Sequence, residues 1–254
     1  MRPLESVPNF SEGRDRATLE ALGSALGSQA RVLDMHSDRD HNRSVFTLVG
    51  SAEELVESLL AGIACARERI DLRAHEGAHP RIGAADVVPL VPLVPEDMER
   101  AREAALALAE RIGAELELPV FVYGELAPRR GPAFFRTGGV EELARRLEAG
   151  ELVPDFGPDR LDERAGGVLV GARRPLIAFN VNLRGSLEDA REVAASVRER
   201  DGGFPGVRAL GLDLPHGGVV QVSMNVEDYE AAALHDIVER IRREASARGA
   251  EVVG

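Results

Sequence analysis

Strand-like and helix-like patterns alternate along this 254-residue chain, and the same order of elements occurs twice. Apolar runs and stretches of helical periodicity in residues 3–93 give the order strand, helix, strand, strand, helix, strand. Residues 175–248 give strand, helix, strand, strand, helix. This is the order of the split βαβ unit. The sequence therefore predicts two related halves in which helices cover sheets.

Cap signals and strand patterns support the same organisation. Ser51 and Ser186 each stand before an acidic helix start, as in a capping box. Alternating strands run into acidic segments at 45–54 and again at 220–229. The predicted strands lie near 31–36, 44–50, 86–93, 119–124, 175–183, 206–213 and 218–226, and the predicted helices at about 15–28, 52–70, 95–116, 139–149, 187–200 and 227–248.

We thus expect an α/β (α+β) fold of two ferredoxin-like βαββαβ subdomains, residues 1–170 and 171–254. The Pro- and Gly-bearing stretch 151–171 is interpreted as the connection between the halves. The second half ends soon after its last helical pattern, so it is expected to lack its closing strand. The segment 214–218 is interpreted as a hairpin turn that contains His216.

The amino-acid composition excludes several classes of function. The chain contains no lysine, which excludes a Schiff-base lysine and the P-loop lysine. A net charge of -12, no tryptophan and two tyrosines argue against nucleic-acid binding. No apolar run approaches the roughly 18 residues of a membrane span, and the first residues lack a signal peptide's apolar region. With Cys65 as its single cysteine, the protein is expected to be cytoplasmic.

Residues 71–83 concentrate titratable groups. His75 and His79 stand four residues apart, close to Arg81, in a segment that also contains Gly77 and Gly83. Such a spacing binds zinc on a helix, but Gly77 and the proline after His79 disfavour a regular helix there. An imidazole held on a loop is the usual proton-transfer group near neutral pH. His79 is therefore the candidate base, with zinc binding and a structural role as alternatives.

Two further segments carry polar groups. Residues 34–43 contain His36, His41, Asn42 and Arg43 among aspartates, and allow a metal loop, a substrate loop or a solvated hairpin. The arginines disfavour a dication, so we prefer a substrate loop in which Asn42 and Arg43 face a ligand carboxylate. Near the N-terminus, Asn9 and Ser11 precede a helix whose free N–H groups could hold an anion, or they serve as a simple cap.

Several ordered segments resemble the glutamate formimidoyltransferase family. They are VPNFSEG at 7–13, NRSVFTLVG at 42–50, HPRIGAAD at 79–86, VYGE at 122–125, PDFGP at 154–158, GAR at 171–173 and LIAFNVNL at 176–183. The resemblance spans nearly the whole chain. It implies two α/β subdomains, a folate substrate and a homodimer. It also implies that a separate cyclodeaminase performs the step that follows in histidine degradation.

The same resemblance assigns residues. It makes His79, in the His-Pro-Arg motif, the catalytic residue. It places folate on the segment after Pro-Asp-Phe, made of Gly157, Pro158, Asp159, Arg160, Leu161, Asp162, Glu163, Arg164, Ala165 and Gly166. The interior of that segment is more charged than the family pattern. The expected substrate-binding residues are Asn9, His41, Asn42, Arg43 and Arg81, with the two arginines as carboxylate clamps.

The implied reaction moves the formimino group of N-formimino-L-glutamate to N5 of tetrahydrofolate, the co-substrate, in histidine degradation. His79 would take a proton from N5 and give one to the departing amine. No metal is expected. Two alternatives stay open at this point: formyl transfer from N-formylglutamate, and a folate-binding or interaction module without activity.

Overall fold

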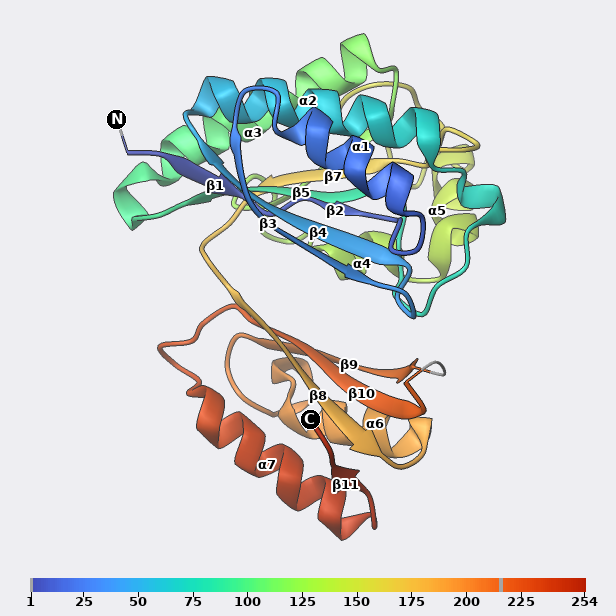
Figure 1. The fold of residues 1–254 in the computed structure, drawn as a ribbon, viewed down its shortest axis with the longest axis vertical. Helices are drawn as coiled ribbons and strands as arrows, with labels where there is room; N and C mark the ends of the chain where they lie inside the picture. The colour runs from blue at the N-terminus through green and yellow to red at the C-terminus, as the bar shows by residue number, and fades with distance from the viewer. Residues whose placement is uncertain (1, 215–216) are drawn as a thin grey trace. The chain divides into compact units, whose positions relative to one another are not determined.

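The computed structural model describes residues 2–214 and 217–254, so the turn that contains His216 lies outside the described residues. The chain forms two compact units, Met1–Arg174 and Pro175–Gly254, each with its own sheet (Figure 1). Each unit has a separate apolar core. The α/β class and the two-subdomain organisation are thereby confirmed.

The first unit holds the larger sheet. Its strands are β1 (Leu4–Ser6), β2 (Asn9–Phe10), β3 (Arg31–Asp38), β4 (Arg43–Gly50), β5 (Ala85–Pro92), β6 (Val120–Gly124) and β7 (Val168–Ala172). Its helices are α1 (Arg16–Leu26), α2 (Ala52–Arg69), α3 (Met98–Glu115), α4 (Pro132–Arg136) and α5 (Gly139–Glu148), with short 3-10 turns η1 (Leu72–Ala74) and η2 (Pro95–Asp97).

Strand pairing shows the split βαβ order directly. β1 and β2 both lie between β4 and β5, so together they form one interrupted strand. β3 pairs with β4 at one edge, and the parallel strands β7 and β6 extend the sheet beyond β5. Capping boxes at Ser51 and Ser186 form as the sequence predicts, each with an acidic side chain three residues later.

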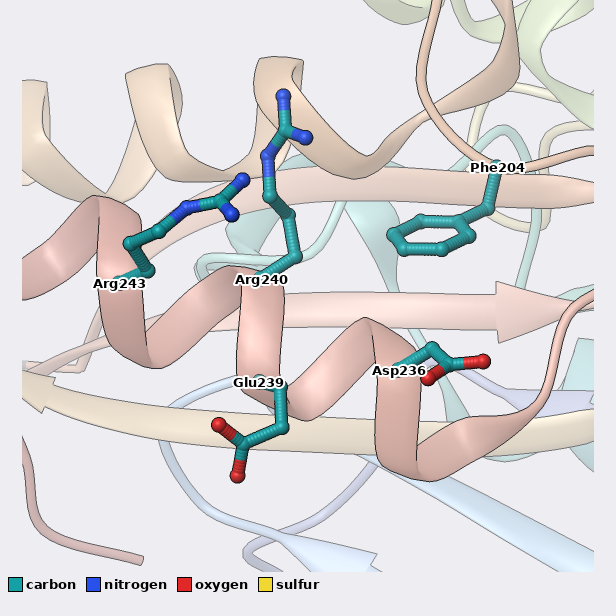
Figure 2. A pocket seen from close by; sticks show the side chains of 5 residues that line it. All are labelled: Phe204, Asp236, Glu239, Arg240 and Arg243. Carbon is teal, nitrogen blue, oxygen red and sulfur yellow. The ribbon is translucent and has the colours of Figure 1, made fainter.

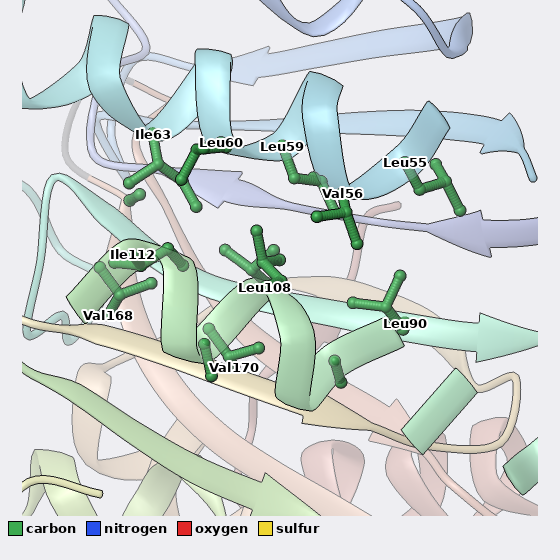
Figure 3. Packing of buried hydrophobic residues seen from close by; sticks show 14 of the residues in the cluster. Leu55, Val56, Leu59, Leu60, Ile63, Leu90, Leu108, Ile112, Val168 and Val170 are labelled. Carbon is green, nitrogen blue, oxygen red and sulfur yellow. The ribbon is translucent and has the colours of Figure 1, made fainter. Parts of the chain in front are cut away.

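Side-chain alternation decides which helices cover which face. On β7, Val168 and Val170 pack into the core formed with α2 and α3 (Figure 3), whereas Leu169 points to the opposite face. The residues that share the face of Leu169 include Phe135 of α4 and Leu143 of α5. Helices α1, α2 and α3 therefore cover one face, and α4 and α5 cover the β5–β7–β6 part of the other (Figure 1).

The second unit repeats the first unit's opening topology. Its elements are β8 (Ile177–Arg184), α6 (Leu187–Val197), η3 (Glu199–Asp201), β9 (Val207–Leu214), β10 (Val219–Val226), α7 (Leu234–Ala247) and β11 (Glu251–Val252). The strand order is β11-β8-β10-β9, which matches the order β5, β1/β2, β4, β3 of the first unit.

Three sequence interpretations need correction. The closing strand is present: β11 pairs with β8, and Val253 N–H adds a bond to the Asn182 carbonyl at 2.9 Å. It is short enough to give little strand pattern. The stretch 151–171 is not a connection, because its last residues form the buried strand β7. The last helix begins at Leu234 rather than near 227, because Asp228 forms a capped turn with Ala231.

The core between α3 and the sheet should dominate the stability of the first unit. Leu108 is fully buried on α3, whereas Leu106 on the same helix is 42% exposed. We expect Leu108→Ala to lower the free energy of unfolding by about 2–5 kcal/mol, because it removes buried methyl groups and leaves a cavity. Leu106→Ala is the matched control and should cost less than about 0.5 kcal/mol. Denaturant unfolding of both variants measures this, and equal costs would contradict the assigned packing.

Candidate active site

The candidate site is built on the face of the larger sheet opposite α1 and α2. Asn9 is paired with Val45 on β4 and with Val87 on β5, so the three side chains share that face. Arg43 is two residues before Val45 and points the same way. The Arg43 Nη2 group donates a hydrogen bond to Asn9 Oδ1, while Asn9 Nδ2 donates to the Val7 carbonyl at 2.7 Å. These two polar residues therefore lie on the open face of the sheet.

Asn42 joins three segments beneath the histidine loop, residues 75–83. Its backbone is left-handed with φ of 46°, a conformation that Asn tolerates better than most residues. Its Oδ1 accepts from Gly13 N–H at 3.0 Å, and its Nδ2 donates to the Glu76 carbonyl at 2.9 Å. Its own carbonyl lies 3.1 Å from His75 Nε2. The side chain expected to face a ligand carboxylate is thus occupied in holding the loop.

Arg81 fastens the same loop from within. One terminal nitrogen, Nη2, donates to the carbonyls of Gly77 and His79 at 2.7 Å each, and Nη1 donates to His75 Nδ1. A side chain at Gly77 would collide with the His41 carbonyl, because an added Cβ would lie 2.3 Å from that oxygen. The loop therefore depends on a glycine and on an arginine whose expected role as a carboxylate clamp stays a prediction.

His75 is committed to the protein through both ring nitrogens. Nε2 donates to the Asn42 carbonyl and Nδ1 accepts from Arg81, which defines a neutral tautomer. Burial, followed by the charge of Arg81, lowers its pKa. The loop is irregular here rather than helical, so the zinc-binding arrangement with His79 does not form. The described residues contain no group of three or more metal-ligand side chains placed to hold an ion.

His79 differs from His75 because its hydrogen bond to the protein is made through one ring nitrogen, Nδ1. Nδ1 lies 2.8 Å from the Pro80 carbonyl, to which only an N–H can donate, so the neutral ring carries its lone pair on Nε2. Its ring meets that of His41 edge to face, with centroids 5.9 Å apart. Burial, then the charges of Arg43 and Arg136, hold its pKa well below 6.5. At neutral pH the imidazole is therefore a neutral base.

Sequence reasoning missed three residues of this region. Asp86 is 2% exposed; its Oδ1 accepts from Ile82 N–H at 2.7 Å, and its Oδ2 accepts from Arg136 Nη2. Tyr123 on β6 is also buried, and burial raises its pKa to about 12. A carboxylate in the otherwise apolar run 84–92 was the available signal, since such residues are rarely buried without a partner. Tyr123 lies in the VYGE segment, which gave it no role in the site, and no local pattern pointed to Arg136.

The expected folate segment lies against the residues that follow the histidine loop. Its end is fixed by the Ala84 N–H bond to the Ala165 carbonyl at 2.8 Å and the Gly167 N–H bond to the Ile82 carbonyl at 3.0 Å. Gly166 has φ of 69°, and a Cβ there would lie 2.1 Å from the Ile82 carbonyl oxygen. The segment and the histidine loop are thus joined through the backbone of residues 82–84.

Local contacts account for part of the segment's charge. Asp162 Oδ1 accepts from the N–H groups of Arg164 and Ala165 at 2.9 and 2.7 Å, which caps a tight turn. Arg164 also pairs with Asp71 at 3.3 Å, between Nε and Oδ2. At the N-terminal segment, the cap of α1 is Asp15 rather than Asn9 or Ser11, and a role of Asn9 in binding an anion stays a prediction.

A hollow of about 410 Å³ in the second unit is lined by Phe204 and four charged residues of α7 (Figure 2). It contains none of the residues discussed above. No helix in the described part of the chain is long and apolar enough to cross a membrane.

Fold and site together define a class: an α/β protein that holds a neutral imidazole among guanidinium groups on an open sheet face. Such a site suits proton transfer on an anionic substrate.

Comparison with known proteins gives the family. Residues 3–173 match the formiminotransferase domain, N-terminal subdomain, and residues 178–254 match the formiminotransferase domain. The chain is 39% identical over 267 residues to the glutamate formimidoyltransferase of Thermoplasma acidophilum, covering 100% of this chain and 88% of that protein. It is 38% identical over 257 residues to the Streptococcus pyogenes glutamate formimidoyltransferase, covering 99% and 86%. The chain belongs to the formiminotransferase family.

A longer relative is also similar. The formimidoyltransferase-cyclodeaminase of Rattus norvegicus is 38% identical over 262 residues, which are 99% of this chain and 48% of that protein. The chain thus spans most of the two microbial relatives and about half of the rat protein.

The environment of His79 generates a pH prediction. Because its folded pKa lies below 6.5, protonation favours the unfolded chain. The stability contributed by neutral His79 is fully present above 6.5 and is lost as the pH falls below that value. Histidine NMR titration should give a midpoint for His79 well below 6.5, and His79→Gln should weaken the acid loss of stability. A His79 midpoint at or above 6.5 would contradict the site geometry.

Substitutions at two glycines test the junction between the expected folate segment, residues 157–166, and the histidine loop. Gly166 and Gly150 both have positive φ, but a Cβ at Gly150 meets nothing within 4 Å. Both Ala variants carry the same backbone cost, of about 1–2 kcal/mol, but only Gly166→Ala also displaces the segment. We expect Gly166→Ala to weaken tetrahydrofolate binding at least tenfold and Gly150→Ala to leave it near wild type, as measured by calorimetry. Equal affinities would overturn this role for the junction.

Proposed function

We propose that this protein transfers the formimino group of N-formimino-L-glutamate to N5 of tetrahydrofolate, giving 5-formiminotetrahydrofolate and L-glutamate. The observation that carries the assignment is His79 as a neutral imidazole with its lone pair on Nε2. Glutamate formimidoyltransferases 38–39% identical over nearly the whole chain support the same reaction. Tetrahydrofolate is a co-substrate in this scheme.

The chemistry needs one group that first accepts and then donates a proton. The N5 lone pair attacks the amidine carbon, and a tetrahedral intermediate forms with positive charge on N5. His79 Nε2 accepts the N5 proton, and the resulting imidazolium protonates the glutamate nitrogen as its bond to carbon breaks. The neutral imidazole is then restored. Proton transfer by a positioned side chain typically contributes 10²–10⁴-fold.

The proposed binding groups surround this base. Arg43 donates a hydrogen bond to Asn9, and the ring of His41 contacts the ring of His79. We assign Asn9, His41 and Arg43 to the glutamyl substrate. Asn42 and Arg81 belong to the same site and act by holding the loop. Residues 157–166 are assigned to folate, supported by their bonds to the residues after the loop.

The cellular setting follows from the same family. We assign the protein to the cytoplasm and to a homodimer. The names of the relatives favour a formimino donor over a formyl donor. They equally favour an enzyme over an inactive folate-binding module.

Replacing His79 with Ala should reduce turnover by at least 10²-fold while largely sparing tetrahydrofolate binding. Formation of 5-formiminotetrahydrofolate from both substrates measures turnover, and calorimetry measures binding. His235→Ala is the control, because that side chain is 81% exposed on α7. Near-normal turnover in His79→Ala would refute the assignment of the base.

A further inference from the structure

The candidate site contains buried donors that the protein does not satisfy. Arg43 Nε and Arg136 Nε are each buried and make no hydrogen bond among the described residues, and the buried Tyr123 hydroxyl has Arg173 as its polar neighbour. They come from β4, α4 and β6 respectively. Buried polar groups are normally hydrogen-bonded, and each exception calls for an explanation. A guanidinium Nε–H can only donate, so a ligand that satisfies these groups must present acceptors.

Asp86 connects the three groups electrostatically. It receives a hydrogen bond from Arg136, and its charge acts on Arg43 and on Tyr123. It also acts on Arg81. One carboxylate therefore faces three guanidinium groups, which leaves an excess of positive charge. Burial lowers the pKa of Arg43 to about 10; the charge of Asp86 opposes this shift, and the charges of Arg136 and Arg81 add to it.

Arg136 and Arg81 differ in how many of their N–H groups remain available to bind a ligand. Arg81 spends both N–H groups of one terminal nitrogen on loop carbonyls and uses the other terminal nitrogen for His75. Arg136 uses Nη2 for Asp86. Its remaining donors are therefore better suited to a bidentate carboxylate than those of Arg81. The hydroxyl of Tyr123 stays protonated at neutral pH because burial raises its pKa to about 12.

We infer that Arg136, together with Arg43 and the Tyr123 hydroxyl, binds a carboxylate group of the glutamyl substrate, and that Asp86 positions Arg136 for this contact. The inference deepens the proposed function and rests on it. A carboxylate offers two oxygens and about four lone-pair sites, enough to accept from both orphaned Nε donors and from the Tyr123 hydroxyl. Its negative charge also offsets the excess of guanidinium charge beside His79.

Steady-state kinetics test the role of Arg136. In Arg136→Gln, the KM for N-formimino-L-glutamate should rise at least tenfold while the KM for tetrahydrofolate stays within twofold. Arg136→Lys should recover part of the loss, because it keeps the charge without the fork. Arg129→Gln removes the same charge from an exposed position and should leave both KM values unchanged. An unchanged donor KM in Arg136→Gln would overturn the inference.

Tyr123→Phe gives a second test that does not depend on removing a buried charge. If the hydroxyl serves only the fold, through its neighbour Arg173, its removal leaves the donor KM unchanged. If it binds the carboxylate, the donor KM rises about fivefold or more. The first of these results would contradict the proposal.

Direct binding separates this inference from the proposed function. Calorimetric titration with L-glutamate should show binding to the unmodified protein and to Arg129→Gln, and at least tenfold weaker binding to Arg136→Gln. If no formimino transfer is detected but this pattern holds, the carboxylate site stands and the reaction assignment falls. If transfer proceeds while L-glutamate binds equally to all three proteins, the site assignment falls and the reaction stands.

Discussion

The hydrogen bonds of Asn42 and Arg81 are the constraint on which the candidate site depends. Residues 75–83 form no helix and no regular strand, so their backbone groups need partners from elsewhere. From a left-handed position between β3 and β4, Asn42 bonds the Glu76 carbonyl and the His75 ring, and Arg81 bonds the carbonyls of Gly77 and His79. The result is an irregular segment fixed on a rigid sheet, which is how a catalytic side chain on a loop can be held accurately.

That scaffold gives the two histidines different chemistry. His75 has both nitrogens bonded within the protein, whereas His79 bonds a carbonyl through one nitrogen and keeps a lone pair on the other. Burial, followed by the charges of Arg43 and Arg136, keeps His79 neutral, and the same arginines contribute to the charge excess that favours an anionic substrate. One electrostatic arrangement therefore serves both the base and the binding of a carboxylate, within a chain whose net charge is -12.

Much of the fold could be predicted because it follows local rules. Period-two and helical patterns, and the caps at Ser51 and Ser186, gave the element order of both halves. Strand β11 and strand β7 were missed because one is two residues long and the other follows a glycine-rich turn. In the site, His79 stood out by its motif. Arg136 and Tyr123 could not be predicted as site residues, because they are far from Asp86 in the sequence. Only the path of the chain from β5 to β6 and α4 places them near Asp86.

The central claim is that His79 is neutral and has its lone pair on Nε2. Long-range ¹H–¹⁵N correlation spectra at pH 7 test this directly, because the two ring nitrogens have different shifts when one carries the proton. The account predicts a protonated Nδ1 and an unprotonated Nε2 for His79, and the opposite tautomer for His75. An imidazolium spectrum for His79, or a proton on its Nε2, would contradict it.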